Sequence, residues 1–142
     1  MTTIKVAAAQ LSPVFLNKKK TVEKACSAIL EAGKQGAELI VFPEAFISGY
    51  PDWVWLIPNS KGADLNDLYI KLVEQAVSVP GLATDQLCKA AKKAGINVVM
   101  CMNERNSESS GASLYNCMFD AAGHYARPDV FNFSVNEIDR TI

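Results

Sequence analysis

The sequence predicts an α/β fold, in which strands and helices alternate along a chain of 142 residues. Two kinds of segment point to this class: short apolar runs of strand length, and longer segments whose apolar residues recur at helical spacing. Capping residues and glycines separate these segments. Because alternating strands and helices pack as layers, we expect a layered α/β arrangement. The expected order is strand, helix, strand, loop, two helices and two strands.

The first strand and the first helix follow each other near the N-terminus. Residues 4–11, IKVAAAQL, predict a strand whose small side chains pack against a close neighbour. Asn17 is a typical N-cap for a helix that runs to about Gln35, and Gly33 and Gly36 supply its stop. One apolar stripe marks the buried face of this helix: Val22, Cys26, Ile29 and Leu30.

A second strand and two further helices make up the middle of the chain. Residues 38–42, ELIVF, are too few for a helix and are apolar on both faces, which indicates a strand covered on both sides. After a loop, Asp64 is expected to cap a helix over 65–78. Thr84 is expected to begin a shorter helix that Gly95 stops.

Two strands and a tail complete the predicted order. Residues 96–104, INVVMCMNE, are again apolar on both faces, and the polar turn over 105–112 leads to SLYNCMFD at 113–120. This pair is expected to be a hairpin at the edge of the sheet. Pro128 limits regular structure in the last stretch, and the alternation in VFNFSV predicts an edge strand or an extended arm.

The overall composition excludes several classes of function. With 14 basic and 15 acidic residues the net charge is −1, so the chain has no basic surplus for binding nucleic acid or an anionic membrane. No apolar segment approaches the roughly 18 residues that a membrane span needs. The N-terminus also lacks the basic start of a signal peptide. We therefore expect a cytoplasmic protein.

The four cysteines and the single histidine predict neither a metal site nor a disulfide framework. Cys26, Cys88, Cys101 and Cys117 form no C-x-x-C pair, and His124 is far from most of them in the sequence. A zinc site needs clustered ligands, and a disulfide framework needs an oxidising compartment. Buried, reduced thiols are the expected state.

Glu44 is the main candidate for chemistry. It follows Pro43 directly after the strand at 38–42, at the carboxyl end where open α/β sheets place their sites. Proline removes a backbone donor and ends the strand, so the next side chain projects beyond it. A glutamate there is suited to act as a general base. The alternative is a carboxylate that only accepts hydrogen bonds from loop amides.

Four segments resemble the nitrilase superfamily of carbon–nitrogen hydrolases. They occur in the family's order between residue 4 and about residue 123: AAAQLSPVF, GAELIVFPEAFISGYPDW, NVVMCMNER and SLYNCMFDAAG. The F-P-E motif with its flanks is fairly specific for the superfamily. The aromatic loop GYPDWVW is most similar to its nitrilase branch.

This resemblance implies a fold and a reaction. Family members form a four-layer α-β-β-α sandwich and commonly oligomerise. This chain is expected to hold only part of that sandwich. Their glutamate, lysine and cysteine hydrolyse a small nitrile or amide, with no metal or organic cofactor. By resemblance, Glu44 is the base that activates the cysteine. Tyr50, Trp53 and Trp55 either line the substrate pocket or simply pack within their loop.

The chain departs from the family pattern after the strand SLYNCMFD. The lysine segment, which in the family is similar to GKHRK, is replaced by DAAGHYARPDVF, and nothing matches the segment of the cysteine nucleophile. Residues 1–123 therefore resemble the N-terminal part of a hydrolase domain, and 124–142 resemble a C-terminal tail, with the middle missing. Cys101 and Cys117 are expected to be core residues rather than substitute nucleophiles.

Two functions of different class remain open on the sequence. The first is a nitrilase-type hydrolase that uses Glu44 and is inactive as this shortened chain alone. The alternative is a non-catalytic family member that associates with a full-length relative, through an uncovered sheet face and the tail. An unrelated binding module is the weakest reading, because both glycine-rich phosphate-loop patterns are absent.

Glu104 and Arg105 either support the site or form a surface ion pair.

Overall fold

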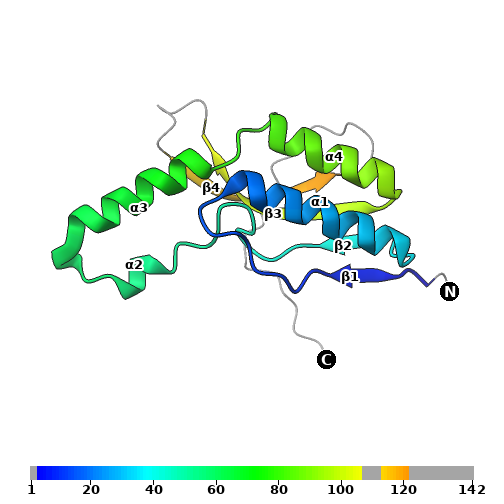
Figure 1. The fold of residues 1–142 in the computed structure, drawn as a ribbon, viewed down its shortest axis with the longest axis horizontal. Helices are drawn as coiled ribbons and strands as arrows, with labels where there is room; N and C mark the ends of the chain where they lie inside the picture. The colour runs from blue at the N-terminus through cyan, green and yellow to red at the C-terminus, as the bar shows by residue number, and fades with distance from the viewer. Residues whose placement is uncertain (1–2, 107–112, 122–142) are drawn as a thin grey trace.

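The computed structural model describes residues 3–106 and 113–121, which form a mixed sheet flanked by helices (Figure 1). The four strands are β1 (Val6–Ala8), β2 (Leu39–Val41), β3 (Asn97–Arg105) and β4 (Leu114–Ala121). Their order in the sheet is β1-β2-β3-β4. The first two pairings are parallel and the last is antiparallel. The predicted α/β class and the antiparallel edge pair are confirmed.

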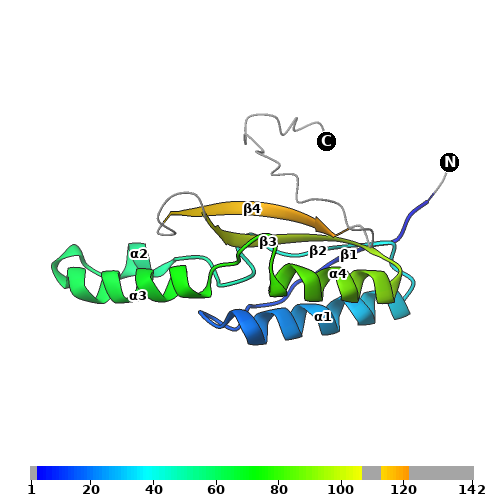
Figure 2. The ribbon, with the colours of Figure 1, turned by 90° about the horizontal axis from the view of Figure 1, so that it is seen from above.

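Helices α1 (Lys18–Lys34) and α4 (Leu82–Ala94) lie together on one face of the sheet (Figure 2). Between them and the sheet lies the hydrophobic core, which includes Val22, Ile29, Leu87, Val98, Met100 and Met102. The two helices approach closely at Gly33. A Cβ atom there would lie 2.9 Å from both the Cβ and the carbonyl oxygen of Ala94. Gly33, which the sequence suggested as a stop signal, therefore serves helix packing.

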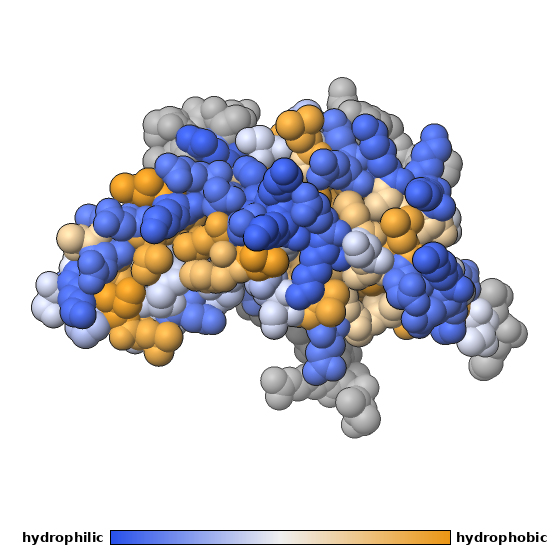
Figure 3. Space-filling view, in the orientation of Figure 1, coloured by the Kyte–Doolittle hydropathy of each residue, from blue (hydrophilic) through white to orange (hydrophobic). Residues whose placement is uncertain are grey.

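Helix α2 (Trp53–Leu56), the 3-10 helix η1 (Asn59–Lys61) and helix α3 (Gly62–Gln75) form an arm beside the sheet (Figures 1 and 2). Hydrophobic residues gather on its surface (Figure 3). The exposed large apolar side chains of the arm include Val54, Trp55, Leu56 and Ile70. The base of the arm is tied to α1, because the Lys18 Nζ donates to the Ala76 carbonyl at 2.6 Å. In the described part of the chain, none of the helices has the length and apolar character needed to span a bilayer.

The helix starts were predicted correctly in one case and wrongly in two. The Asn17 side chain accepts from the Lys20 backbone N–H at 3.0 Å, so the predicted cap of α1 is confirmed. Asp64 lies inside the first turn of α3, because η1 leads directly into that helix. A carboxylate is also favoured there by the helix dipole. Thr84 lies in the third helical position of α4, where its hydroxyl accepts from the Gly81 N–H at 3.0 Å.

The first strand is shorter than predicted, because it lies at the edge of the sheet and has a single neighbour. The last bond from this segment to β2 joins the Ala9 N–H to the Val41 carbonyl at 2.8 Å. The next two amides bond locally, to the carbonyls of Ala8 and Ala9. Of the predicted span 4–11, only Val6–Ala8 is therefore a strand.

The described helices cover one face of the sheet and leave the other uncovered. Ile40 on the helix side is 3% exposed, whereas its neighbour Val41 on the other side is 36% exposed. The prediction that this strand is covered on both sides is therefore wrong for the described residues. We call the uncovered side the open face, and its members include Val6, Leu39, Val41, Val99, Cys101 and Met118. Of the predicted turn at 105–112, Arg105 belongs to β3, and residues 107–112 lie outside the described residues. The predicted tail at 124–142, with His124, lies outside them as well.

Candidate active site

Glu44 lies on a turn that interrupts the pairing beside β3. The Phe42 N–H still donates to a β3 carbonyl at 2.9 Å, but Pro43 has no N–H to continue the ladder. The Phe46 N–H closes the turn on the Pro43 carbonyl at 3.2 Å. Pairing with β3 then resumes at Ile47. The proline therefore ends the strand as expected, and the turn presents Glu44 outside the ladder.

The turn is anchored by the apolar residues on either side of Glu44. The rings of Phe42 and Phe46 pack with their centroids 5.1 Å apart, and both side chains are buried. Ala45 between them has a φ of 47°, in the left-handed region that costs a non-glycine residue about 1–2 kcal/mol. Its small side chain is buried as well. Aromatic anchoring thus holds a backbone conformation that local preference disfavours.

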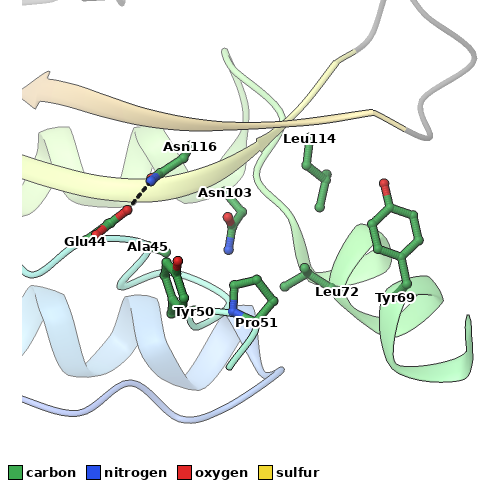
Figure 4. A pocket seen from close by; sticks show the side chains of 9 residues that line it. All are labelled: Glu44, Ala45, Tyr50, Pro51, Tyr69, Leu72, Asn103, Leu114 and Asn116. Atoms are coloured by element: carbon green, nitrogen blue, oxygen red, sulfur yellow. Dashed lines mark hydrogen bonds between the residues drawn. The ribbon is translucent and has the colours of Figure 1, made fainter. Parts of the chain in front are cut away.

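The Glu44 carboxylate is held by an asparagine on β4. The Asn116 Nδ2 donates to the Glu44 Oε1 at 2.6 Å (Figure 4). Asn116 is paired in register with Asn103 on β3, and the buried Asn103 Nδ2 donates to the Gly49 carbonyl at 2.9 Å. The two asparagines thus contact both ends of the segment Glu44–Gly49. They lie on the side of the sheet opposite to the helix layer, because side chains alternate along each strand.

A pocket of about 360 Å³ opens beside this carboxylate (Figure 4). Glu44 and Asn116 lie at one end, and Tyr69 and Leu72 of α3 lie at the other. The complete lining is Glu44, Ala45, Tyr50, Pro51, Tyr69, Leu72, Asn103, Leu114 and Asn116. A small molecule bound here would meet a carboxylate and amides at one end and apolar or aromatic groups at the other.

The structure separates the aromatic residues that the sequence grouped together. Tyr50 is half-exposed and lines the pocket with Glu44. Trp53 is 8% exposed and is not among the lining residues, and its indole Nε1 has no hydrogen-bond partner in the described part of the chain. Trp55 is 80% exposed on the surface of α2. Tyr50 and Glu44 are therefore brought together, whereas the two tryptophans are not.

Seven lining residues escaped the sequence interpretation as site residues: Ala45, Pro51, Tyr69, Leu72, Asn103, Leu114 and Asn116. A signal existed for Asn116, since it is a polar residue within the otherwise mostly apolar strand SLYNCMFD. The two asparagines and α3 meet the Glu44 turn only through tertiary structure, so no local pattern connects them.

Glu104 and Arg105 do not line this pocket. Glu104 lies beside the thiol of Cys117, which is paired with Met102 on the helix side of the sheet. Arg105 is exposed. Because Glu104 lies on the face away from Glu44, the hypothesis that it supports the site is not favoured by this geometry.

The two strand cysteines are poorly suited to act as nucleophiles. Burial raises the pKa of the Cys101 thiol, and the nearby Glu44 carboxylate raises it further. Burial and the Glu104 carboxylate raise the pKa of Cys117 to about 12. A nucleophilic cysteine needs a lowered pKa, so both thiols have the opposite environment. Within the described ranges, no three His, Cys, Asp or Glu side chains gather as potential metal ligands.

The Cys117 thiol predicts a loss of stability at high pH. Its pKa rises from 9.0 in the unfolded chain to about 12 on folding, so its contribution is complete below pH 9 and is lost as the pH approaches 12. In that window the free energy of unfolding falls by up to about 1.4 kcal/mol per pH unit. Urea unfolding near pH 8 and pH 10.5 should show a larger loss for the wild type than for Cys117→Ala. Equal losses in the two proteins would contradict this assignment.

Comparison with known proteins places this site in a family context. A family model described as carbon–nitrogen hydrolase matches residues 5–124. The chain is 42% identical over 111 residues to a nitrilase from Bacillus sp. (strain OxB-1), covering 78% of this chain and 30% of that protein. It is 37% identical over 101 residues to an arylacetonitrilase from Aspergillus oryzae, covering 71% and 29%. The chain thus spans about a third of the length of these relatives.

Solved structures show the same partial correspondence in the fold. An amidase from Nesterenkonia sp. AN1 superposes with a TM-score of 0.51 at 21% identity, covering 85% of this chain and 41% of that chain. A glutamine-dependent NAD(+) synthetase from Cytophaga hutchinsonii superposes with a TM-score of 0.51 at 19% identity, covering 86% and 17%. At these identities the likeness concerns the fold alone.

Proposed function

Because the chain belongs to the carbon–nitrogen hydrolase family, we propose that it carries the base and part of the substrate pocket of a nitrilase-type active site. One observation supports this assignment above all. Glu44 is presented by a turn at the carboxyl end of β2, and its carboxylate lies at one end of a pocket of about 360 Å³. A carboxylate in this place is accessible to a small substrate and to a neighbouring nucleophile.

The proposed reaction converts a nitrile and two waters into a carboxylic acid and ammonia. Glu44 takes the proton from a cysteine thiol, whose sulfur then attacks the nitrile carbon. A lysine stabilises the negative charge that develops on nitrogen, and water afterwards releases ammonia and the acid. The lysine and the cysteine segments that family resemblance implies have no counterpart in this sequence. Of the three catalytic groups, this chain therefore supplies only the base.

The pocket lining supports a small substrate with an apolar group. Leu72, Leu114 and the ring of Tyr69 line the part of the pocket away from Glu44, and Tyr50 and Pro51 lie nearby. Such a lining suits an aromatic or aliphatic substituent next to a nitrile. Arylacetonitrilases and an aliphatic nitrilase are among the similar proteins, and an amidase shares the fold. We propose nitriles as the substrates, with the corresponding amides as the second class to assay.

The chain on its own is expected to release no measurable ammonia. The segment of the family's cysteine nucleophile is missing, and burial and the Glu44 carboxylate raise the pKa of the nearby Cys101 thiol, so the first bond to the nitrile carbon is not expected to form. Purified chain is incubated with phenylacetonitrile, butyronitrile and butyramide, and ammonia is measured against a full-length nitrilase as the positive control. Release that disappears in Glu44→Gln would overturn the expectation, because it would require a nucleophile within these 142 residues.

A second candidate function is association with a full-length relative, and the open face favours it. Val41 on this face is 36% exposed, and Val99, Cys101 and Met118 are only half-buried. No described helix covers these side chains, and an uncovered apolar surface promotes association. We propose that the hydrolase-like part of the chain ends at residue 123. The tail at 124–142 is proposed to take part in the same contact. A complex with a full-length nitrilase in size-exclusion chromatography supports this role, and a well-dispersed monomer counts against it.

A further inference from the structure

Two asparagines hold the segment that carries Glu44 at its two ends. Asn103 and Asn116 face each other in register across β3 and β4. The Asn103 amide donates to the Gly49 carbonyl at 2.9 Å, and this contact is buried. The Asn116 amide instead donates to the side chain of Glu44 at 2.6 Å, in an exposed position. One asparagine therefore fixes backbone, and the other fixes a carboxylate.

The backbone of this segment is already fixed without Asn116. The Gly49 N–H donates to the Ala45 carbonyl at 3.0 Å, and the Ser48 hydroxyl donates to the Gln75 carbonyl. The Glu44 side chain has no such constraint of its own, because it is exposed and rotates about three side-chain bonds. A hydrogen bond to Oε1 restricts that rotation and leaves Oε2 available to accept a proton. The contact of Asn116 therefore acts on the orientation of the carboxylate.

An amide is a suitable group for this task on chemical grounds. It carries no charge, and it does not titrate at any pH at which the protein is folded. A lysine or arginine in its place would stabilise the ionised carboxylate strongly and so weaken it as a base. A neutral donor orients the carboxylate with a smaller effect of this kind. The choice of residue type thus matches the needs of a general base.

We propose that Asn116 is the positioning residue for Glu44, directing one carboxylate oxygen into the pocket for proton transfer. This inference rests on the proposed role of Glu44 as the base. It concerns a different property, however, because the orientation of the carboxylate can be measured in the chain as it exists, without any catalytic activity.

Cys101 provides the measurement. Its thiol lies on β3 close enough to Glu44 for the carboxylate to raise its pKa, in addition to the effect of burial. Because the thiolate is the species that reacts with iodoacetamide, the alkylation rate of Cys101 reports the presence of the carboxylate nearby. Glu44→Gln is expected to raise this rate at least about twofold. Mass spectrometry of the labelled peptides separates Cys101 from the other three cysteines.

A double-mutant cycle tests the proposal. If Asn116 holds the carboxylate in place, Asn116→Ala releases it into solvent, and the Cys101 rate rises toward that of Glu44→Gln. In the Glu44→Gln background, Asn116→Ala should then have little further effect. Asn116→Leu, which keeps the size of the side chain and removes the donor, should give the same pattern. Asn97→Ala is the matched control, since Asn97 lies on β3, the strand of Cys101, and its amide donates to the Glu38 carbonyl instead of to Glu44.

Two outcomes would overturn the proposal. Equal increases in the Glu44 and Glu44→Gln backgrounds would show that Asn116 only shields Cys101 sterically. No increase in either background would show that Glu44 keeps its place without the amide. The labelling rate of the buried Cys117 is followed in every variant as a check that the variant is folded. The Cys101 rates count only in variants whose Cys117 stays protected from labelling. Failure of the proposed function appears separately, as nitrile hydrolysis that Glu44→Gln leaves unchanged in a chimera supplying the missing lysine and cysteine.

Discussion

Glu44→Gln is expected to lower nitrile hydrolysis by about 10²–10⁴-fold in a chimera that supplies the missing catalytic residues. In this chimera the chain replaces the matching segment of the nitrilase from Bacillus sp. (strain OxB-1), to which it is 42% identical. The amide of glutamine keeps the size of the side chain and the contact region with Asn116, but it cannot accept the thiol proton. The loss should therefore appear mainly in kcat, measured as ammonia release from phenylacetonitrile.

The matched control for this substitution is Asp52→Asn. Asp52 is also an exposed carboxylate near Tyr50, but it does not line the pocket. The same change of charge there should leave kcat within about twofold, as is usual for surface substitutions. Equal activity of the chimera with and without Glu44→Gln would contradict the role of Glu44 as the base.

Phe46→Ala is expected to lower the free energy of unfolding by about 3–5 kcal/mol. The Phe46 side chain is 1% exposed and packs against Phe42 with the ring centroids 5.1 Å apart. Its removal leaves a cavity under the turn and takes away the anchor that holds Ala45 in the left-handed region. Since domains of this size have total stabilities of about 5–15 kcal/mol, the effect is large. Urea unfolding followed by circular dichroism measures it.

Phe15→Ala is the control for the loss of an aromatic side chain. Phe15 is about half exposed, so its truncation removes little buried surface and should cost clearly less than Phe46→Ala. A loss below about 1 kcal/mol for Phe46→Ala would contradict the assignment of this ring as an anchor of the turn. Such a result would mean that the Glu44 turn is held by other contacts.

Local sequence signals predicted those parts of the fold that depend on neighbouring residues. Asn17 caps α1 through an atom three residues away, and Pro43 ends the pairing of β2 because it lacks an N–H. The assignments of Asp64 and Thr84 as helix starts were wrong. In both cases the helix begins before the expected residue. The start of a helix depends on the conformation of the segment that precedes it.

The candidate site was predictable only in part, for a related reason. Glu44 follows a strand and a proline, so its place at the end of β2 could be inferred from adjacent residues. Tyr50 lies in the same loop and does reach the pocket, whereas Trp53 turns into the protein interior. A run of aromatic residues does not reveal which of them face a cavity, because that depends on the elements packed against the loop.

The sequence by itself determined the α/β class, the family and the presence of a lone glutamate at the end of a strand. These rest on periodicity, capping chemistry and motifs, all of which act over short stretches of chain. Only the tertiary structure decided that the carboxylate meets Asn116, which is 72 residues away, and that α3 closes the far side of the pocket. Sheet pairing and helix packing bring such residues together, and their energies depend on three-dimensional contacts that no local pattern encodes.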